Sequence, residues 1–154
     1  VRELIQALDA PDGLPGSARE QMLTALVLDE ITHADTHALG VPLPHADSGD
    51  KRLRALCEAV LREPSARTTL ATQAASVGAS ERTMARLFRE ELGLGYQQWR
   101  QQVALAHALP LISRGTPISD VAAASGYTSD SAFSAMFKTA MGQPPRYFQG
   151  HTKP

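Results

Sequence analysis

The sequence predicts an all-α fold, and three observations support this class. Apolar residues recur at helical spacing along most of the 154 residues. No stretch alternates apolar and polar residues with the β-branched enrichment that is typical of strands. Glycines also follow the apolar runs where helices should end, at Gly93, Gly115, Gly126 and Gly142. We therefore expect a series of helices joined by short turns.

The first forty residues are expected to contain two helices. A short helix fits residues 1–8 and is closed by the breaker-rich stretch DAPDGLPGS. A second helix begins near Ser17, which has Glu20 in the capping-box position, and runs to about Leu39. An apolar stripe on this helix is suited to pairing with a second copy of the chain or to packing on another domain, and it consists of Met22, Leu23, Leu26, Val27 and Ile31.

Residues 41–50 are expected to form a linker, because the stretch GVPLPHADSGD that starts at Gly40 is rich in Pro, Gly and Asp. A second domain then spans residues 51–150. Its expected helices cover residues 51–63, 69–77, 80–92, 96–113, 117–125, 129–141 and 145–149. Pro110 lies inside the fourth of these helices and removes a backbone hydrogen bond. We expect the helix to kink or end there, at a cost of about 3 kcal/mol if nothing compensates.

The bulk composition is that of a soluble globular protein, with 43% hydrophobic residues. The sequence has neither a run of about 18 apolar residues nor a leader of the secretory kind, so we expect a cytoplasmic protein without membrane contact. The single cysteine, Cys57, lies in an apolar series of helical spacing and is expected in the core. Because the chain begins with Val, we expect it to belong to a longer protein.

The net charge of −1 conceals a strong asymmetry along the chain. Residues 1–50 hold two Arg against nine acidic residues, a net charge of −7. Residues 51–154 hold thirteen Lys and Arg against seven acidic residues, a net charge of +6. The basic part is therefore the candidate for a polyanion partner.

One motif is written twice in the basic part. Leu70, Ala74 and Gly78 recur 48 residues later as Ile118, Ala122 and Gly126. A second set recurs 49 residues later, so that Ser80, Met84, Leu87, Phe88 and Gly93 match Ser129, Phe133, Met136, Phe137 and Gly142. Each copy reads as a helix with a small Ala one turn before a Gly, a tight turn, and a Ser-capped helix. This pattern indicates two helix-turn-helix units joined by one long helix.

The outer face of the second helix of the first copy is basic, because it carries Arg82, Arg86 and Arg89. Arg82 and Arg86 are four residues apart, and equal charges at this spacing destabilise an isolated helix by a few tenths of a kcal/mol. An anionic partner would relieve the repulsion, and arginine bonds bidentately to guanine in the major groove. A salt bridge to Glu90 would account for Arg86 alone, although not for Arg82.

Residues 51–150 resemble the DNA-binding domain of AraC/XylS-type transcription regulators. The stretches GASERTMARLF and GYTSDSAFSAMFKTAMGQPPRYF carry the resemblance most specifically. It implies two helix-turn-helix units on a shared linking helix, whose recognition helices enter successive major grooves of double-stranded DNA. It also implies that residues 1–40 are the helical tail of a sensor or dimerisation domain.

The resemblance places two sets of DNA contacts on this chain. The positions expected to face bases are Arg82, Thr83 and Arg86, with Ala85 alongside, in the first copy and Asp130, Ser131, Ser134 and Ala135 in the second. The residues expected to contact phosphates are Thr69, Ser80, Arg89, Arg100, Ser119, Ser129 and Lys138, although each also fits an ordinary helix cap or solvated residue.

The sequence departs from the family pattern in two places. Ser131 and Ala135 stand at the counterparts of Arg82 and Arg86, so base reading is expected to be concentrated on the first copy. Asp130 either accepts a hydrogen bond from a cytosine amine or simply complements the helix dipole. In the linking helix, alanines 104 and 106 replace the Arg and large aliphatic residue frequent in relatives. The rigidity of that helix is therefore an open question.

The expected function is sequence-specific DNA binding in transcription regulation. Activation is expected, because it is the commoner role in the family. The alternative is an interaction module that contacts RNA polymerase or another protein with little base reading. Further expected partners are RNA polymerase, a second copy paired through residues 17–39, and an effector bound by a domain outside this sequence. No catalytic pattern is present, so we expect neither an enzyme nor a cofactor. His33 and His37 lack fixed further ligands, and we expect no metal site.

Overall fold

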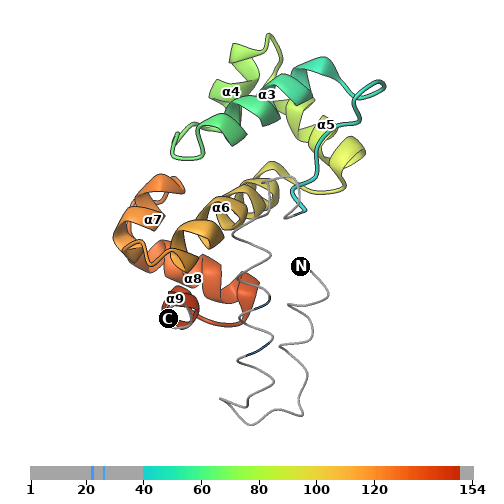
Figure 1. The fold of residues 1–154 in the computed structure, drawn as a ribbon. Coiled ribbons are helices and arrows are strands. Elements are labelled where there is room, and N and C mark those ends of the chain that lie inside the picture. The colour runs from blue at the N-terminus through green and yellow to red at the C-terminus, as the bar shows by residue number, and fades with distance from the viewer. Residues whose placement is uncertain (1–21, 23–25, 27–39, 150–154) are drawn as a thin grey trace.

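The fold is described from a computed structural model, which describes residues 22, 26 and 40–149. Within residues 40–149 the chain forms helices and no strand, which confirms the expected all-α class (Figure 1). The helices are α3 (Lys51–Arg62), α4 (Leu70–Ser76), α5 (Glu81–Leu92), α6 (Tyr96–Ser113), α7 (Ile118–Ala124), α8 (Asp130–Met141) and α9 (Pro145–Gln149).

Most helices begin one residue later than expected, because the residue taken as the first of the helix is its N-cap. The side-chain oxygens of Thr69, Ser80 and Ser129 accept hydrogen bonds from the backbone N–H three residues on, at the starts of α4, α5 and α8. Each bond satisfies one of the N–H groups that a helix start leaves without a partner. The predicted positions of the helices are thus confirmed to within one residue at these starts.

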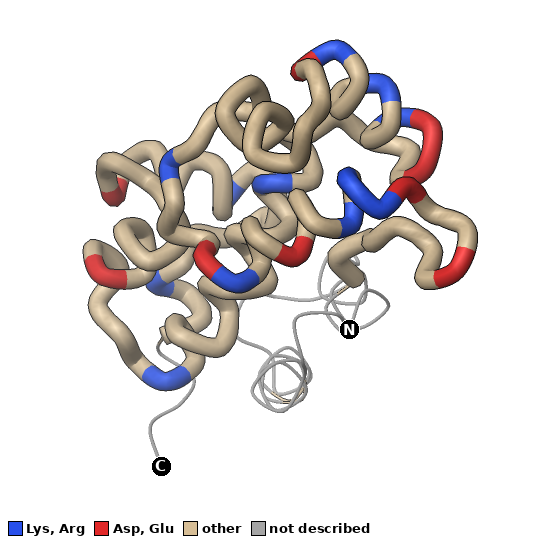
Figure 2. Tube along the Cα trace, turned by 90° about the horizontal axis from the view of Figure 1, so that it is seen from above, with Lys and Arg blue, Asp and Glu red and all other residues tan. Residues whose placement is uncertain are grey.

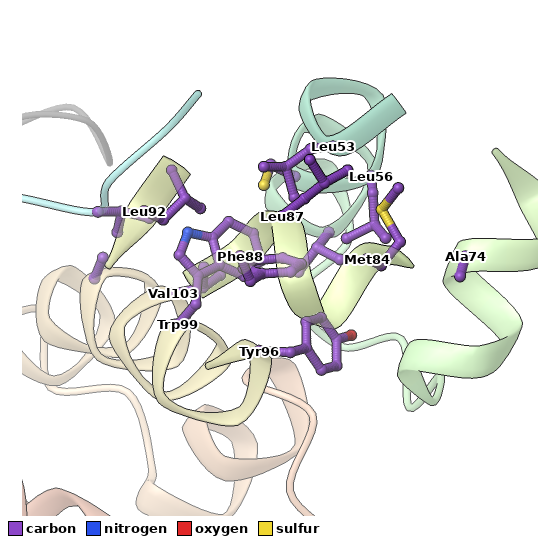
Figure 3. Packing of buried hydrophobic residues seen from close by; sticks show 14 residues of the cluster. Leu53, Leu56, Ala74, Met84, Leu87, Phe88, Leu92, Tyr96, Trp99 and Val103 are labelled. Atoms are coloured by element: carbon purple, nitrogen blue, oxygen red, sulfur yellow. The ribbon is translucent and has the colours of Figure 1, made fainter. Parts of the chain in front are cut away.

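The first hydrophobic core lies among α3, α4, α5 and the first half of α6, and we call this part of the chain the first unit. Phe88 is fully buried at its centre, with its ring 5.4 Å from that of Tyr96 and 5.5 Å from that of Trp99 between centroids (Figure 3). Cys57 is buried in the same cluster, as expected. Burial raises the pKa of its thiol to about 12, so the group stays neutral.

The second core lies between the second half of α6 and helices α7, α8 and α9. We call this part of the chain the second unit. Its centre is a run of aromatic rings, in which Phe137 lies 5.7 Å from Phe133 and 5.6 Å from Phe148. The buried residues of the two cores form separate clusters. Helix α6 contributes to both clusters and is therefore the structural link between the units (Figure 1).

Helix α6 runs through Pro110 and ends only at Ser113. The expected bounds 96–113 are confirmed. Of the two outcomes expected at the proline, a kink or an end, the end is wrong, because the helix continues for three residues beyond it. The carbonyl of Pro110 accepts hydrogen bonds from the N–H of Arg114 and from the hydroxyl of Ser113. The two alanines that depart from the family pattern, Ala104 and Ala106, are both buried.

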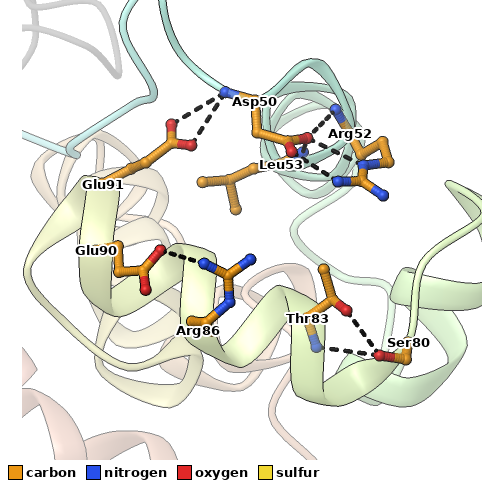
Figure 4. Close-up of polar contacts among 8 residues, drawn as sticks. All are labelled: Asp50, Arg52, Leu53, Ser80, Thr83, Arg86, Glu90 and Glu91. Carbon is orange, nitrogen blue, oxygen red and sulfur yellow. Dashed lines mark hydrogen bonds and ion pairs between the residues drawn. The ribbon is translucent and has the colours of Figure 1, made fainter.

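The segment 41–50, expected as a linker, is fastened to the first unit. Val41 is buried in the first core, and the indole N–H of Trp99 donates to the carbonyl of Pro42 at 2.8 Å. The N–H of Asp50 donates to both carboxylate oxygens of Glu91, at 3.1 and 3.2 Å (Figure 4). We call residues 41–50 the strap. The sequence could not show this, because the bonds join segments 41 to 57 residues apart.

Of the apolar stripe expected in residues 17–39, the structure describes only Met22 and Leu26. Both side chains are exposed, at 67% and 50% of their full accessible area. The other stripe residues, the metal-ligand candidates His33 and His37, and the short helix expected at residues 1–8 lie outside the described residues. Among the helices that are described, none has the length and apolar character that crossing a bilayer requires.

Candidate nucleic-acid interface

The two predicted turns have the same backbone geometry. After α4, Gly78 has a φ of 68°, and the N–H of Ala79 bonds to the carbonyl of Ala74 at 2.9 Å. After α7, Gly126 has a φ of 85°, and the equivalent bond joins the residues 48 positions on, also at 2.9 Å. This is the Schellman ending, in which glycine adopts the left-handed conformation at low cost. The repeat seen in the sequence is therefore a repeat in three dimensions.

The start of α5 is fixed by a compact hydrogen-bond group. The hydroxyl of Ser80 accepts from the N–H of Thr83 at 3.1 Å, and the two hydroxyls lie 2.8 Å apart (Figure 4). The hydroxyl of Thr83 is thus engaged at the cap, although sequence reasoning placed it among the base contacts.

Three arginines follow along the exposed surface of α5, and we call Arg82, Arg86 and Arg89 the basic face. All three side chains are exposed. The Nη1 atom of Arg86 lies 2.6 Å from the carboxylate of Glu90 (Figure 4), so the expected salt bridge is present. Both groups are more than half exposed, and such a pair is worth at most about 1 kcal/mol. The pair orients the guanidinium and leaves its Nε and Nη2 edge for a bidentate acceptor.

The corresponding surface of α8 is nearly uncharged. Asp130, Ser131 and Ala135 are exposed, and Ser134 is half-buried. Asp130 lies in the first turn, where a carboxylate complements the positive end of the helix dipole. Lys138 is exposed in the last turn. The structure therefore places every base-facing candidate of the second copy on one short stretch of α8 without an arginine.

The phosphate candidates divide into three groups. Arg89 and Lys138 are exposed cations, while Ser119 is exposed in the first turn of α7. The hydroxyls of three further candidates are occupied as helix caps, namely Thr69, Ser80 and Ser129. Their helix starts can still present backbone N–H groups to an anion. All these assignments stay predictions.

Arg100 differs from the other phosphate candidates, because its guanidinium is directed at the protein's own backbone. Its Nη2 atom donates to the carbonyl of Ala66 at 3.1 Å and to that of Pro64 at 3.4 Å. Sequence reasoning missed this contact and also missed Arg67, whose Nη2 donates to the carbonyl of Tyr127 at 2.9 Å. Backbone carbonyls carry no signature in a sequence, so no pattern could have indicated these pairs.

The charged residues are concentrated on the first unit (Figure 2). Of the twelve Lys and Arg residues within residues 40–149, nine precede residue 104, as do seven of the nine acidic residues. Basic residues in a row along one helix provide the electrostatic component of nucleic-acid binding. The described residues contain no group of three or more His, Cys, Asp or Glu side chains placed to hold a metal ion. The basic face of α5 is the candidate surface for a polyanion.

Comparisons with known proteins agree with this geometry. A family model described as a helix-turn-helix domain matches residues 73–151. The transcriptional regulator NimR of Escherichia coli is 34% identical over 123 residues, which cover 80% of this chain and 44% of NimR. The transcriptional activator RhaR of Yersinia pseudotuberculosis is 37% identical over 71 residues, which cover 45% of this chain and 24% of RhaR. The chain thus spans less than half the length of these curated relatives.

Solved structures share the fold. The C-terminal domain of AraT from Geobacillus stearothermophilus superposes with a TM-score of 0.64 at 24% identity, covering 68% of this chain and 88% of that domain. A DNA-binding transcriptional dual regulator from Escherichia coli gives a TM-score of 0.61 at 25% identity, with coverages of 70% and 97%. An AraC-type regulator from Chromobacterium violaceum gives 0.60 at 22% identity, with coverages of 67% and 94%. The chain belongs to the helix-turn-helix domain family, whose model matches residues 73–151, just over half of its length.

Proposed function

We propose that this chain binds DNA in a sequence-specific way as the DNA-binding part of a transcription regulator. The observation that carries the proposal is the repeat of one helix-turn-helix at the two ends of α6. A single helix-turn-helix occurs in many helical proteins, whereas two copies on one connecting helix are suited to two neighbouring segments of the same duplex. The names of the relatives support the assignment, since both are transcriptional regulators.

The length of α6 fits this use. Its 18 residues span roughly 27 Å at 1.5 Å per residue. Successive major grooves on one face of DNA are roughly 34 Å apart. Because each unit also extends beyond its end of α6, helices α5 and α8 can occupy neighbouring grooves of a single duplex.

The two units are proposed to contribute differently. The basic face of α5 reads bases through Arg82 and Arg86, with Arg89 on a phosphate. Helix α8 adds phosphate contacts through Lys138 and a weaker contact to bases through its Ser hydroxyls, Ala methyl and Asp130. Information in the binding site should therefore be concentrated over one groove.

Selection of binding sites from a random duplex pool tests the proposal directly. We expect a motif whose informative positions cover one groove, and an affinity that falls steeply with salt concentration. A chain that selects no motif and whose affinity merely falls with salt would contradict the proposal. That result would favour the interaction module considered from the sequence.

Single substitutions to alanine on α5 and α8 test which residues contact bases and which contact phosphates. Arg86→Ala should weaken the selected site by about 1–3 kcal/mol and relax one base position. Lys138→Ala should instead weaken all duplexes roughly equally and reduce the salt slope by about 1. Arg62→Ala, which removes an exposed arginine at the end of α3, is the matched control. Unchanged affinity in the Arg86 variant would remove that residue from the reading surface.

The partners of the whole regulator form a further part of the proposal. We place it in the cytoplasm, with RNA polymerase as a protein partner and an effector held by a domain outside this sequence. The name of the Yersinia relative supports activation. We propose no catalytic activity. Pairing through residues 17–39 is supported by the exposure of Met22 and Leu26. Sedimentation of the chain as a monomer at high concentration would contradict that pairing.

A further inference from the structure

The loop between α3 and α4 reaches from the first unit to the turn of the second unit (Figure 1). Arg67 in this loop donates from Nη2 to the carbonyl of Tyr127 at 2.9 Å. The bond joins residues 60 positions apart and connects the units at a point separate from the axis of α6. The units therefore have a second attachment besides the shared helix.

Arg100 holds the same loop from the side of α6. Its Nη2 atom donates to the carbonyls of Ala66 and Pro64, at 3.1 and 3.4 Å. Hydrogen bonds from a charged donor are stronger than those between neutral groups. The half-buried guanidinium is also shielded from water, which strengthens its bonds to the two carbonyls. The loop is thus fixed to α6 and to the second turn at once.

Gly126 allows the loop between α3 and α4 to lie close to the turn after α7. A Cβ atom at this position would lie 2.8 Å from the carbonyl oxygen of Pro64 and 3.1 Å from Nη2 of Arg100. At Gly78, the equivalent position of the first unit, a Cβ would meet nothing within 4 Å. Both glycines have positive φ, at 85° and 68°, so the turn itself needs glycine in both units. Only in the second unit does the glycine also make room for the other unit.

The charge of Arg100 acts on aromatic side chains of both units. Burial raises the pKa of Tyr96 in the first unit, and the positive charge of Arg100 opposes that shift. Burial likewise raises the pKa of Tyr127 in the second unit, again opposed by Arg100. The guanidinium therefore lies within electrostatic reach of both units.

We propose that Arg67, Arg100 and Gly126 form a clasp that fixes the orientation of α8 relative to α5. The three are positioning residues, which determine the base-pair spacing that the chain accepts between its two half-sites. This inference rests on the proposed function for its consequence on DNA, while the clasp itself can be tested without DNA.

The clasp is needed because α6 alone fixes the orientation of α8 relative to α5 only weakly. Pro110 removes one backbone hydrogen bond from α6 within the second unit, where a helix bends most readily. The buried residues of the two cores form separate clusters. A bend of α6 would swing α8 relative to α5. A second attachment at the turn after α7 opposes that swing.

Pulsed electron spin resonance between α5 and α8 tests the clasp on the free protein. Spin labels on cysteines at the exposed positions Glu81 and Ala140, in a Cys57→Ala background, report the distance between the two recognition helices. We expect one narrow distance distribution in the parent protein. The double variant Arg67→Ala with Arg100→Gln should broaden and shift this distribution, and Arg100→Lys should restore part of it.

Two glycine variants provide a matched pair. Gly126→Ala and Gly78→Ala both place a Cβ at a positive φ and cost similar backbone strain. Only Gly126→Ala also inserts a methyl group into the contact with Pro64. The distance distribution should shift in the Gly126 variant and stay unchanged in the Gly78 variant. Circular dichroism and thermal unfolding confirm that each variant folds before it is compared.

Spacing variants of the selected duplex test the consequence. One inserted base pair rotates the second half-site by roughly 35° relative to the first. The parent chain should lose affinity on this duplex, whereas the Arg67 and Arg100 variants should discriminate about tenfold less between the two spacings. Arg67→Ala alone should leave the affinity for a duplex with only the first half-site unchanged.

The outcomes separate the two proposals. Unchanged distance distributions in all clasp variants would overturn the clasp, whatever the DNA result. A shifted distribution with no sequence-selective binding by the parent chain would support the clasp as a structural device and overturn the proposed function together with the spacing role. A shifted distribution with an unchanged spacing profile would overturn the spacing role alone.

Discussion

The two helix-turn-helix units have the same backbone geometry in their turns and differ in the charged residues on their surfaces. Their turns have the same Schellman bonds, and a capping serine begins each recognition helix. The exposed side of α5 carries three arginines besides Glu81, Glu90 and Glu91, whereas α8 carries Asp130 and Lys138 as its only charged residues. The turn and core residues are constrained by folding, while the outward residues are constrained only by the partner. One fold thus presents two helix surfaces with different numbers of charged residues.

The units also differ in how they are supported. The first unit has an additional helix, α3, and the strap, which the Trp99 indole and the Glu91 carboxylate hold in place. The second unit is closed by the short helix α9 and by the aromatic run around Phe137. Trp99 and Cys57 are the chain's single Trp and Cys, and both lie in the first core. Each is a natural probe of the first unit alone.

The largest effect is expected from Phe137→Ala, which empties the centre of the second core. The substitution should destabilise the second unit by about 3–5 kcal/mol. Because the cores form separate clusters, the first unit should remain folded. Far-ultraviolet circular dichroism should lose part of its helical signal on mild heating, while the Trp99 fluorescence transition stays near its original temperature.

Phe88→Ala is the matched control in the first core. It should lower the temperature of the Trp99 fluorescence transition and expose Cys57 to thiol reagents. The thiol is otherwise neutral and buried, with a pKa near 12. If Phe137→Ala also exposes Cys57, the two units unfold as one and the comparison between independent cores is wrong.

A second prediction breaks the asymmetry of the recognition helices. The double substitution Ser131→Arg and Ala135→Arg places on α8 the residues that stand at the equivalent positions of α5. We expect tighter binding by about 1–3 kcal/mol per new base contact, a steeper salt dependence, and a selected motif with information over both grooves.

Two arginines placed elsewhere on α8 control for charge alone. Thr139→Arg and Ala140→Arg lie near the C-terminal end of that helix and are also exposed. They should tighten binding to all duplexes without new informative positions. A wider motif in this control would show that charge, and not the position on the helix, extends the reading surface.

Local patterns predicted most of this fold. The offset of 48 in one helix and 49 in the next identified the two units, because turn glycines and capping serines leave clear marks in a sequence. Phe88 and Phe137, which match each other in the repeat, are both buried. Contacts between distant segments could not be predicted in the same way. The bonds from Trp99 to Pro42 and from Arg67 to Tyr127 end on backbone carbonyls, which every residue possesses.

The same distinction applies to the candidate interface. The sequence placed Arg82 and Arg86 on one exposed face of a helix, and the structure agrees. It also assigned Arg100 to the phosphate set, because arginine side chains commonly contact phosphates. The three-dimensional arrangement directs this side chain at a loop 34 to 36 residues away. Charge and spacing therefore identify a surface, whereas the direction of a long side chain depends on its tertiary neighbours.

Pro110→Ala sharpens the comparison within α6 itself. Alanine would supply the missing N–H to the carbonyl four residues earlier and relieve the steric cost of the ring. We expect the second unit to gain about 2 kcal/mol, after allowance for the greater freedom of the unfolded chain. Thermal unfolding followed by circular dichroism should show the gain, while the Trp99 transition stays unchanged.

Pro117→Ala is the control, because Pro117 is the N-cap of α7, where the missing N–H breaks no helical bond. It should leave stability unchanged or lower it by less than about 1 kcal/mol. A gain from Pro117→Ala as large as that from Pro110→Ala would show that the proline within α6 carries no special cost.

The smallest effect concerns Asp50, the last residue of the strap, and depends on pH. Asp50 caps α3, and the hydrogen bond from the Arg52 side chain lowers the pKa of its carboxyl from 3.8 to about 2 (Figure 4). A carboxyl whose pKa is lower in the folded protein stabilises it fully above the ordinary pKa of 3.8. This contribution is lost as the pH falls from there through about 2. The pair is partly exposed to water, so its contribution to the free energy of unfolding is small.

Asp50→Asn isolates this charge, because asparagine caps a helix about as well as aspartate. The variant should be slightly less stable than the parent above pH 4, and the difference should vanish towards pH 2. Urea unfolding followed by Trp99 fluorescence measures it, since this probe reports the first unit alone. The second unit, which contains Phe137, should unfold with the same pH dependence in both proteins. A pH-independent difference in the Trp99 transition would mean that Asp50 stabilises α3 through cap geometry and not through its charge.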